Sequence, residues 1–258
     1  MSVLSVRDLS KAFGGVHAVN AVSFEVQPAE FLAMIGPNGA GKSTCFNMIN
    51  GQLKPDAGEI LLADHTIAGS PPREIWRLGV GRTFQVAATF ASMTVAENVQ
   101  MALLSHASDI YRLWRPAAGM HRERALALLE QVGMRDAADR PSRELAYGDV
   151  KRVELAIALA NEPRLLLMDE PTAGMGARER YELIELVKRL VTERGISVLF
   201  TEHSMDVVFA FADRIIVLAR GRLIAEGNAE AIRDNDKVRE VYFGSGKTFG
   251  DASQGVVR

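Results

Sequence analysis

The feature that most constrains the fold of this 258-residue chain is a glycine-rich turn between an apolar run and a predicted helix. Residues 36–43 fit the pattern G-x-x-x-x-G-K-[ST], residues 31–35 before them are all apolar, and residues 45–49 after them can extend as a helix. In a strand, loop and helix of this kind, backbone N–H groups of the loop surround phosphate oxygens, and the positive end of the helix faces the same anion. The pattern therefore predicts nucleotide binding, and the alternative is a glycine-rich turn that binds nothing.

Individual positions of this loop have expected tasks in phosphate binding. Lys42 can reach the β- and γ-phosphates, and the Ser43 hydroxyl is suited to ligate a Mg²⁺ ion that bridges them. Thr44 is expected to pack within the helix or to contact phosphate. The residues predicted to hold the nucleotide are Gly36, Pro37, Asn38, Gly39, Ala40, Gly41, Lys42, Ser43 and Thr44.

Composition argues against several other classes of protein. The chain has 30 basic and 32 acidic residues, so no basic excess points to nucleic acid. Because its start has no basic segment before an apolar core, and no apolar run approaches the roughly 20 residues of a membrane-spanning helix, we expect a chain that is neither exported nor membrane-spanning. The single cysteine, Cys45, excludes an internal disulfide. We predict a core residue there, and the alternative is a reactive thiol, because a helix N-terminus lowers thiol pKa.

The rest of the chain alternates predicted strands with predicted helices. Residues 3–26 are typical of an antiparallel β-layer, residues 93–159 are mainly helical, and residues 165–168 are typical of a strand buried on both faces of a parallel sheet. Further predicted elements are a strand at 59–62, helices at 122–132, 150–160 and 181–191, a strand at 197–201, and a hairpin formed by 215–218 and 223–225. Together they predict an α/β domain with a helical insertion.

Polar residues follow two of these strands at the point where each ends. Asp169 and Glu170 end the run 165–168, and His203 follows the strand 197–201. Open α/β sheets bind ligands at the carboxyl ends of their strands. We therefore expect Asp169 to hold Mg²⁺ through water, Glu170 to polarise a water molecule for in-line attack, and His203 to contact the γ-phosphate. The alternatives are a helix-capping role for Glu170 and a structural role for His203.

In this order along the chain, the motifs resemble those of the ATP-binding subunits of ABC transporters. The stretches that carry the resemblance are residues 36–44, Gln85, residues 145–149, residues 165–171 and His203. It implies an α/β fold of the P-loop NTPase, ABC type, with a mainly parallel core sheet, an antiparallel β-layer and a helical subdomain. The implied single domain covers residues 1–243, with the helical subdomain at approximately 88–160 and a flexible tail at 244–258.

The resemblance also implies roles for residues outside the phosphate loop. Phe13 takes the position of the aromatic that stacks on adenine, and its alternative is an ordinary half-buried strand residue. Gln85 links the Mg²⁺ site to the membrane subunit, and Ala146, Tyr147 and Gly148 belong to the signature that touches ATP held by the opposite subunit. The implied catalytic residues are Lys42, Gln85, Glu170 and His203, and the implied Mg²⁺ ligands are Ser43, Gln85 and Asp169.

Within this family the chain is most similar to ATPases of branched-chain amino acid importers, and importers of urea or aromatic acids share much of the pattern. The supporting stretches are residues 79–85, 93–99, Tyr147 and 241–244. The resemblance implies ATP and Mg²⁺ as cofactors and a peripheral place on the cytoplasmic face of the inner membrane. The implied partners are a second ATPase chain in a heterodimer, two permease subunits and, indirectly, a periplasmic binding protein, with no nucleic acid. Phe90 and Met93 are candidates for the permease dock, and core packing is their alternative.

Two positions depart from the family pattern. Ala146 stands where the signature usually has serine, and Gly176 stands where the loop after the Asp-Glu pair often has aspartate. The lost hydroxyl of the signature would weaken one phosphate contact. These departures point to one alternative function, that of a module that holds ATP without useful hydrolysis. Independently of them, the chain could be an ABC ATPase that never meets a membrane and acts in translation or on nucleic acid.

Overall fold

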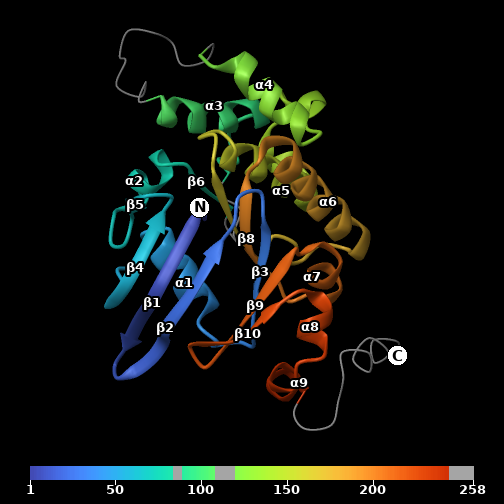
Figure 1. Ribbon diagram of the computed structural model, residues 1–258. Coiled ribbons are helices and arrows are strands. Elements are labelled where there is room, and N and C mark those ends of the chain that lie inside the picture. Colours follow the sequence, from blue (N-terminus) through green and yellow to red (C-terminus); the bar gives the residue numbers. More distant parts are fainter. Residues whose placement is uncertain (84–88, 108–119, 244–258) are drawn as a thin grey trace.

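The computed structural model describes residues 1–83, 89–107 and 120–243, and its centre is a six-stranded sheet in the order β10-β9-β3-β8-β7-β6 (Figure 1). Its strands are β3 (Phe31–Ile35), β6 (Val80–Thr83), β7 (Leu165–Asp169), β8 (Ser197–Thr201), β9 (Arg214–Ala219) and β10 (Arg222–Gly227). All neighbours pair in parallel except β9 and β10, which form the predicted hairpin. The predicted mainly parallel core sheet is confirmed.

The predicted antiparallel β-layer is a second sheet in the order β2-β1-β4-β5. Its strands are β1 (Leu4–Phe13), β2 (Val16–Val26), β4 (Ala57–Leu62) and the short β5 (His65–Thr66). The strand predicted at 59–62 begins two residues earlier, at Ala57, because Asp56 N–H and Ala57 already pair with Ser10 of β1. This sheet lies beside the central sheet with helix α1 between them (Figure 1).

The helices divide between the two faces of the central sheet. They are α1 (Lys42–Ile49), α2 (Pro72–Arg77), α3 (Val95–His106), α4 (Arg122–Gln131), α5 (Tyr147–Ala158), α6 (Ala177–Arg194), α7 (Met205–Phe211), α8 (Ala229–Arg233) and α9 (Asp236–Phe243), with short 3₁₀ turns η3 (Arg135–Ala137) and η4 (Ser142–Glu144). Helices α3 and α4 lie over one end of the sheet (Figure 1). Among the described residues, no helix combines the length and the apolar character needed to cross a membrane.

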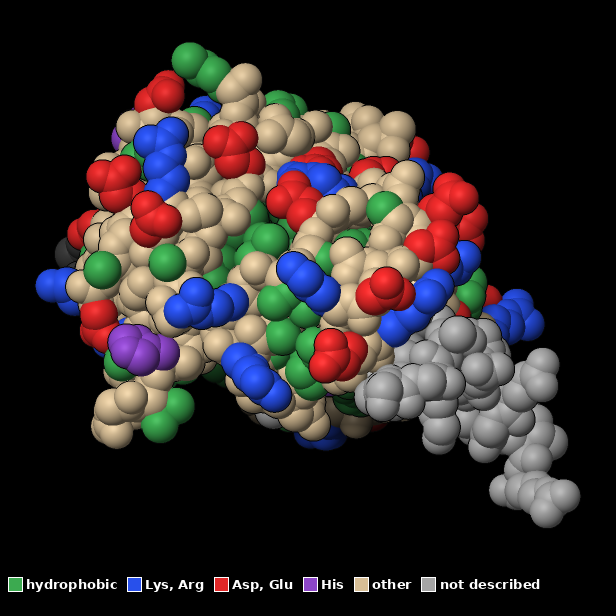
Figure 2. Space-filling model, turned by 60° about the horizontal axis from the view of Figure 1, so that its bottom comes forward, with side chains coloured by type: hydrophobic (Ala, Val, Ile, Leu, Met, Phe, Trp, Pro, Cys, Tyr) green, Lys and Arg blue, Asp and Glu red, His purple; other side chains and the backbone are tan. Residues whose placement is uncertain are grey.

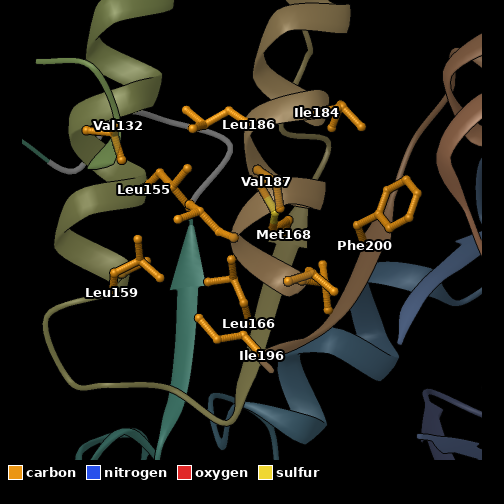
Figure 3. Packing of buried hydrophobic residues seen from close by; sticks show 14 of the residues in the cluster. Val132, Leu155, Leu159, Leu166, Met168, Ile184, Leu186, Val187, Ile196 and Phe200 are labelled. Carbon is orange, nitrogen blue, oxygen red and sulfur yellow. The ribbon is translucent and has the colours of Figure 1, made fainter. Parts of the chain in front are cut away.

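Burial on both faces of the sheet explains why its strands are continuous apolar runs. In β3, Phe31, Ala33 and Ile35 belong to the core under α3 to α6, whereas Leu32 and Met34 belong to the core shared with α1 and the antiparallel sheet. Successive side chains of a strand point to opposite faces, so every residue of such a strand must be apolar. Figure 3 shows the first core, where α5 and α6 pack against β7 and β8.

Several local predictions are corrected by the structure. The helix predicted at 150–160 begins at Tyr147, and the helix predicted at 181–191 begins at Ala177. The first turn of α6 is mostly polar, and that of α5 begins with the exposed Tyr147 and with Gly148, so neither first turn shows the apolar periodicity from which a helix is predicted. Phe90 is 55% exposed, so core packing is wrong for its side chain.

Cys45 is a core residue, as predicted. Its side chain is fully buried, and burial raises the pKa of its thiol to about 12. The reactive-thiol alternative is therefore wrong, because desolvation of the thiolate outweighs the stabilisation that a helix N-terminus can offer.

Candidate functional site

The predicted site residues meet at the carboxyl ends of three neighbouring strands of the central sheet. The phosphate loop follows β3, Asp169 and Glu170 end β7, and His203 follows β8, which lies between the other two. Parallel pairing brings these three ends to one edge although they lie far apart in sequence. Gln85 falls outside the described residues.

Two positions of the phosphate loop require glycine, because the loop passes so close to other backbone that a side chain would collide with it. A Cβ at Gly36 would lie 2.2 Å from the carbonyl oxygen of Leu218, and one at Gly41 would lie 2.4 Å from that of Ala18. Gly41 also has a φ of 105°, which side-chain-bearing residues rarely adopt. The loop formed by residues 36–41 leads directly into α1, whose first turn leaves backbone N–H groups without helical partners. This is the cradle that a phosphate group requires.

Lys42 lies inside this cradle with 7% of its surface exposed. Its ammonium donates to the carbonyl oxygens of Gly36, at 2.6 Å, and Pro37, at 3.3 Å. Burial lowers the pKa of Lys42, against the opposing attraction of Glu170 and Asp169. A buried cation held by loop carbonyls is suited to exchange them for phosphate oxygens, which supply the negative charge.

The two adjacent carboxylates at the end of β7 have different surroundings. Asp169 accepts a hydrogen bond from the Thr201 hydroxyl at 2.7 Å, and its other oxygen is 3.6 Å from the Arg82 guanidinium. Glu170 has a φ of 48°, which turns its side chain off the line of the strand. Its Oε1 lies 2.7 Å from Nε2 of His203. Because the next helix begins at Ala177 with Gly176 as its N-cap, Glu170 does not cap it.

The donor set at this edge fits a hard divalent cation. Asp169 offers carboxylate oxygens with 13% of its side chain exposed, and Ser43 offers an exposed hydroxyl in the first turn of α1. The described residues contain no cluster of three or more His, Cys, Asp or Glu side chains that could hold a metal ion alone. Mg²⁺ commonly takes only one or two protein ligands and completes its shell with phosphate oxygens and water, so this small set suits it.

Three residues of the site were missed by reasoning from sequence. The Thr201 hydroxyl, which donates to Asp169, also accepts from the backbone N–H of Glu170 at 3.0 Å. Arg82 joins Asp169 to α1, since it donates to the side-chain oxygen of Asn47 at 3.1 Å. The sequence does show a polar residue at the end of each apolar strand. This pattern does not indicate that Thr201 and Arg82 contact Asp169.

Glu202 is the third such residue, and it connects the two loops around His203. Its carboxylate is 4% exposed and accepts from the backbone N–H and hydroxyl of Thr172, at 3.0 and 2.5 Å. The other oxygen accepts from the N–H groups of His203, at 3.1 Å, and Ser204, at 3.4 Å. The loop after Glu170 and the segment that carries His203 are therefore held by one buried side chain.

Glu202→Gln is expected to lower the free energy of unfolding by about 1.5–3 kcal/mol, because an amide cannot accept all these hydrogen bonds. Turnover of nucleotide is expected to fall about tenfold through misplacement of His203, with nucleotide affinity unchanged. Urea unfolding and phosphate release measure the two effects. The exposed Glu185→Gln is the control and should change neither. Full stability in Glu202→Gln would contradict the connecting role.

The remaining predicted contacts lie on exposed surfaces. Phe13 ends β1 with 51% of its side chain exposed. Ala146 is the N-cap of α5, and Tyr147, 46% exposed, lies against Gly174, where a Cβ would be 3.6 Å from its ring. The expected place of the signature at a helix N-terminus is confirmed. Exposed positions are what contact with an opposite subunit would require.

The second departure, Gly176, is not imposed by the backbone. Its φ of -64° suits any residue, and a Cβ there would meet only an oxygen of Glu179, at 3.8 Å. Glu179 accepts from the Gly176 N–H and so completes half of a capping box at the start of α6. An aspartate would therefore fit at this position, and the local structure does not require glycine there.

Comparison with known proteins places these features in context. Residues 19–173 match the family model described as ABC transporter, and residues 222–248 match that of the branched-chain amino acid ATP-binding cassette transporter. The LivG protein of Escherichia coli K12, a high-affinity branched-chain amino acid transport ATP-binding protein, is 40% identical over 94% of this chain and 98% of its own. BraF of Pseudomonas aeruginosa, of the same description, is 39% identical over 94% and 98%.

Solved structures of related proteins have the same architecture. A nucleotide-free ATP-binding cassette from an ABC transporter is 33% identical, has a TM-score of 0.85 and covers 95% of this chain and 100% of its own. An ATP-binding cassette in a dimeric post-hydrolysis state with ADP and phosphate is 28% identical, with a TM-score of 0.74 and coverage of 88% and 98%. The likeness thus extends over nearly the whole chain.

Proposed function

Because the chain belongs to the family of ABC transporter ATP-binding proteins, we propose that it powers the import of branched-chain amino acids. Binding and hydrolysis of ATP are the activity of this family. The observation that supports the activity most directly is the meeting of Lys42, Asp169, Glu170 and His203 at one edge of the central sheet.

The chain's own residues divide the chemistry among them. Lys42 and the backbone N–H groups of the phosphate loop hold the phosphates of ATP. We assign Ser43 and Asp169 to Mg²⁺, which supplies charge neutralisation at the β- and γ-phosphates when bound. Glu170 orients and polarises the attacking water, and His203, at 2.7 Å, holds the Glu170 carboxylate in place and faces the γ-phosphate.

The proposed substrate class comes from the relatives. Those at 39–40% identity are named for branched-chain amino acids, and the match of residues 222–248 adds a family model of the same name. Urea and aromatic acids remain the nearest alternative substrates. Since the permease and the binding protein select the transported molecule, the test of substrate must include those chains.

We further assign this chain to a dimer of ATPase chains, in which the signature residues Ala146, Tyr147 and Gly148 contact ATP held by the opposite chain. The dimeric relative supports two cassettes acting together. A second, different ATPase chain is the proposed partner. Two permease subunits and a periplasmic binding protein complete the proposed importer, with this chain peripheral on the cytoplasmic face of the inner membrane.

A cavity of about 380 Å³ is the proposed dock for a permease helix. It lies between α2, β6, α3 and α5, and its walls include Ile75, Trp76, Ala102 and Ile157. Arg82 also lines it, and this residue is 3.6 Å from Asp169. A helix seated there would therefore touch a side chain that contacts the Mg²⁺ site. The exposed Phe90, whose backbone N–H donates to the side chain of Asn98 on α3, is a further candidate for contact with the permease.

Purification of a tagged chain from its native membrane tests the proposed assembly. We expect two permease subunits and a second ATPase chain to co-purify. Trp76→Ala should reduce the yield of the permease subunits at least tenfold, while the thermal stability of the chain should fall no further than the truncation of this side chain alone explains. Recovery of the chain alone from the soluble fraction, or with ribosomes, would favour the non-transport ABC ATPase. Uptake of labelled leucine against urea by the reconstituted complex then decides the substrate class.

Ala146→Ser is expected to speed the site of the partner chain roughly tenfold or more, because it returns a phosphate-binding hydroxyl. The same change caps α5, since Ala146 is an extended N-cap without a side-chain hydrogen bond, and should add about 1 kcal/mol of stability. Phosphate release by the assembled dimer and thermal unfolding measure the two effects.

Ala146→Gly is the matched control for this change. Glycine at an N-cap restores most of the stability that serine gives but has no hydroxyl. It should therefore stabilise α5 without changing turnover. Equal turnover in the serine and glycine variants would refute a rate-tuning role for Ala146.

A further inference from the structure

A second cavity, of about 520 Å³, lies on the opposite side of the phosphate loop from the strand-end carboxylates and is not used by the proposed function. It is bounded by Pro37 of the loop, by the β9–β10 hairpin and by α9. Its size is that of small-molecule sites. Figure 2 views the end of the molecule where α9 and the hairpin lie, and shows Lys and Arg side chains around an area of apolar ones.

The walls of this cavity combine apolar surface with uncompensated positive charge. Ala219, Ile224 and Val241 supply the apolar part. Arg220 lies in the turn of the hairpin and Arg222 begins β10. Both are exposed, and neither has an ion-pair partner among residues 1–83, 89–107 and 120–243. Two free guanidinium groups beside apolar walls match a carboxylate that carries an aliphatic chain.

Charges on α9 complete the polar part of the cavity. Lys237 and Glu240 also line it, three residues apart on one helix, where such side chains can pair. Glu240 offers the only carboxylate among the residues that line this cavity in the described part of the chain, and it can receive an ammonium group. An apolar amino acid would therefore find partners for both of its charges.

Both walls of the cavity are joined to the phosphate loop. The N–H of Gly221, in the hairpin turn, donates to the carbonyl oxygen of Ala40 at 3.0 Å. On α9, the largely buried Tyr242 hydroxyl accepts from the backbone N–H of Gly36, and burial raises the pKa of Tyr242 although this bond acts against the rise. A molecule between hairpin and helix thus lies between two supports of the loop that holds phosphate.

We propose that this cavity is a binding site for a small aliphatic carboxylate, and that its occupation steadies the phosphate loop through Tyr242 and Gly221. The carboxylate pairs with Arg220 and Arg222, and the aliphatic chain packs on Ile224 and Val241. Since the bound molecule orders α9 and the hairpin in the arrangement that supports Gly36 and Ala40, it should tighten nucleotide binding severalfold. Linkage requires nucleotide to tighten carboxylate binding by the same factor.

Titration calorimetry of the full chain with leucine, the keto acid of leucine and acetate tests the site. We expect binding of at least one of the two branched acids at concentrations of about 1 mM, and binding of acetate at least tenfold weaker, because each buried methylene strengthens binding roughly fourfold. If leucine binds more tightly than its keto acid, Glu240 is assigned to the ammonium group. If the keto acid binds more tightly, that role of Glu240 is excluded and the carboxylate site is kept. Equal binding of acetate, or no binding of either branched acid up to about 10 mM, would overturn the proposal.

Variants separate the site from its effect on the phosphate loop. Arg222→Gln should weaken the branched acid at least tenfold, whereas Arg189→Gln, an exposed arginine on α6, should not. Tyr242→Phe should keep the affinity for the acid but reduce its dependence on ADP, because the contact of Gly221 with Ala40 still joins the cavity to the phosphate loop. Unchanged binding in Arg222→Gln would overturn the site, and an ADP dependence in Tyr242→Phe as large as in the parent protein would overturn the route through Tyr242.

The coupling to nucleotide rests on the proposed function, but binding of the acid does not. Calorimetry with the acid alone reports on the cavity even for a chain that fails to hydrolyse ATP. If the acid binds and no ATPase activity is found, the proposed function fails and the site stands. If ATPase activity is present and no acid binds, the site fails alone.

Discussion

Replacing Glu170 by Gln is expected to lower phosphate release at this chain's own site by about a hundredfold or more while nucleotide still binds, and to leave the slower site of the partner chain unchanged. The amide keeps the size of the side chain and a contact with Nε2 of His203, which lies 2.7 Å from Oε1 in the parent protein. It lacks the negative charge that polarises an attacking water. Lys42 and the phosphate loop are unchanged, so the affinity for ATP should stay within a few-fold. Phosphate release by the assembled transporter and fluorescence titration with a nucleotide analogue measure the two quantities.

The control for this prediction is Glu193→Gln, which removes an exposed carboxylate of α6. Its turnover should equal that of the parent. A Glu170→Gln protein that retains more than a tenth of the parent's turnover at this chain's own site would remove Glu170 from the role of general base. A parent protein that binds ATP but releases no phosphate in the full assembly would instead favour the module that holds ATP without hydrolysis.

Replacing Lys42 by Met is expected to weaken ATP binding roughly tenfold to a hundredfold and, at the same time, to stabilise the nucleotide-free protein. The ammonium makes charged hydrogen bonds to phosphate, which methionine cannot replace. In the absence of nucleotide the same ammonium is buried, with 7% of its surface exposed, and burial lowers its pKa in spite of Glu170 and Asp169. An unbranched apolar side chain of similar length removes this cost.

The pH dependence of stability gives a second readout for Lys42. Its pKa in the folded protein is lower than the ordinary value of 10.5, so the unfolded chain binds more protons over the pH range between the two values. The free energy of unfolding contributed by this group therefore rises as pH increases toward 10.5. Lys42→Met should lose this rise, and the exposed control Lys54→Met should keep it. A Lys42→Met protein that binds ATP as tightly as the parent would contradict the assigned role.

Much of the fold could be predicted from local patterns. The run at 165–168 was predicted as a strand buried on both faces, and β7 is that strand, with four of its five residues buried. The helix stop at Gly133 is confirmed by its φ of 72° just after α4. Such predictions succeed because a strand inside a parallel sheet needs apolar side chains on both faces, and a left-handed helix end favours glycine.

Boundaries without such patterns were less predictable. The start of α5 at Tyr147 follows Ala146, which has no capping side chain, so nothing in the residue types marks it. The start of α3 is different, because Thr94 and Glu97 form a capping box. The strand predicted at 59–62 was short by two residues, since its first pairs depend on Ser10 of β1.

By itself, the sequence determined the class of fold, the phosphate loop and the strand-end positions of Asp169 and His203, because each depends on residues that are near neighbours in the chain. Only the tertiary structure decided that Thr201 contacts Asp169, that Glu202 holds Thr172 beside His203, and that Tyr242 meets Gly36. These contacts join elements separated by long stretches of chain. The order of the strands brings these partners together, and burial makes their polar groups hydrogen-bond to one another. Neither effect leaves a periodic signal in the sequence.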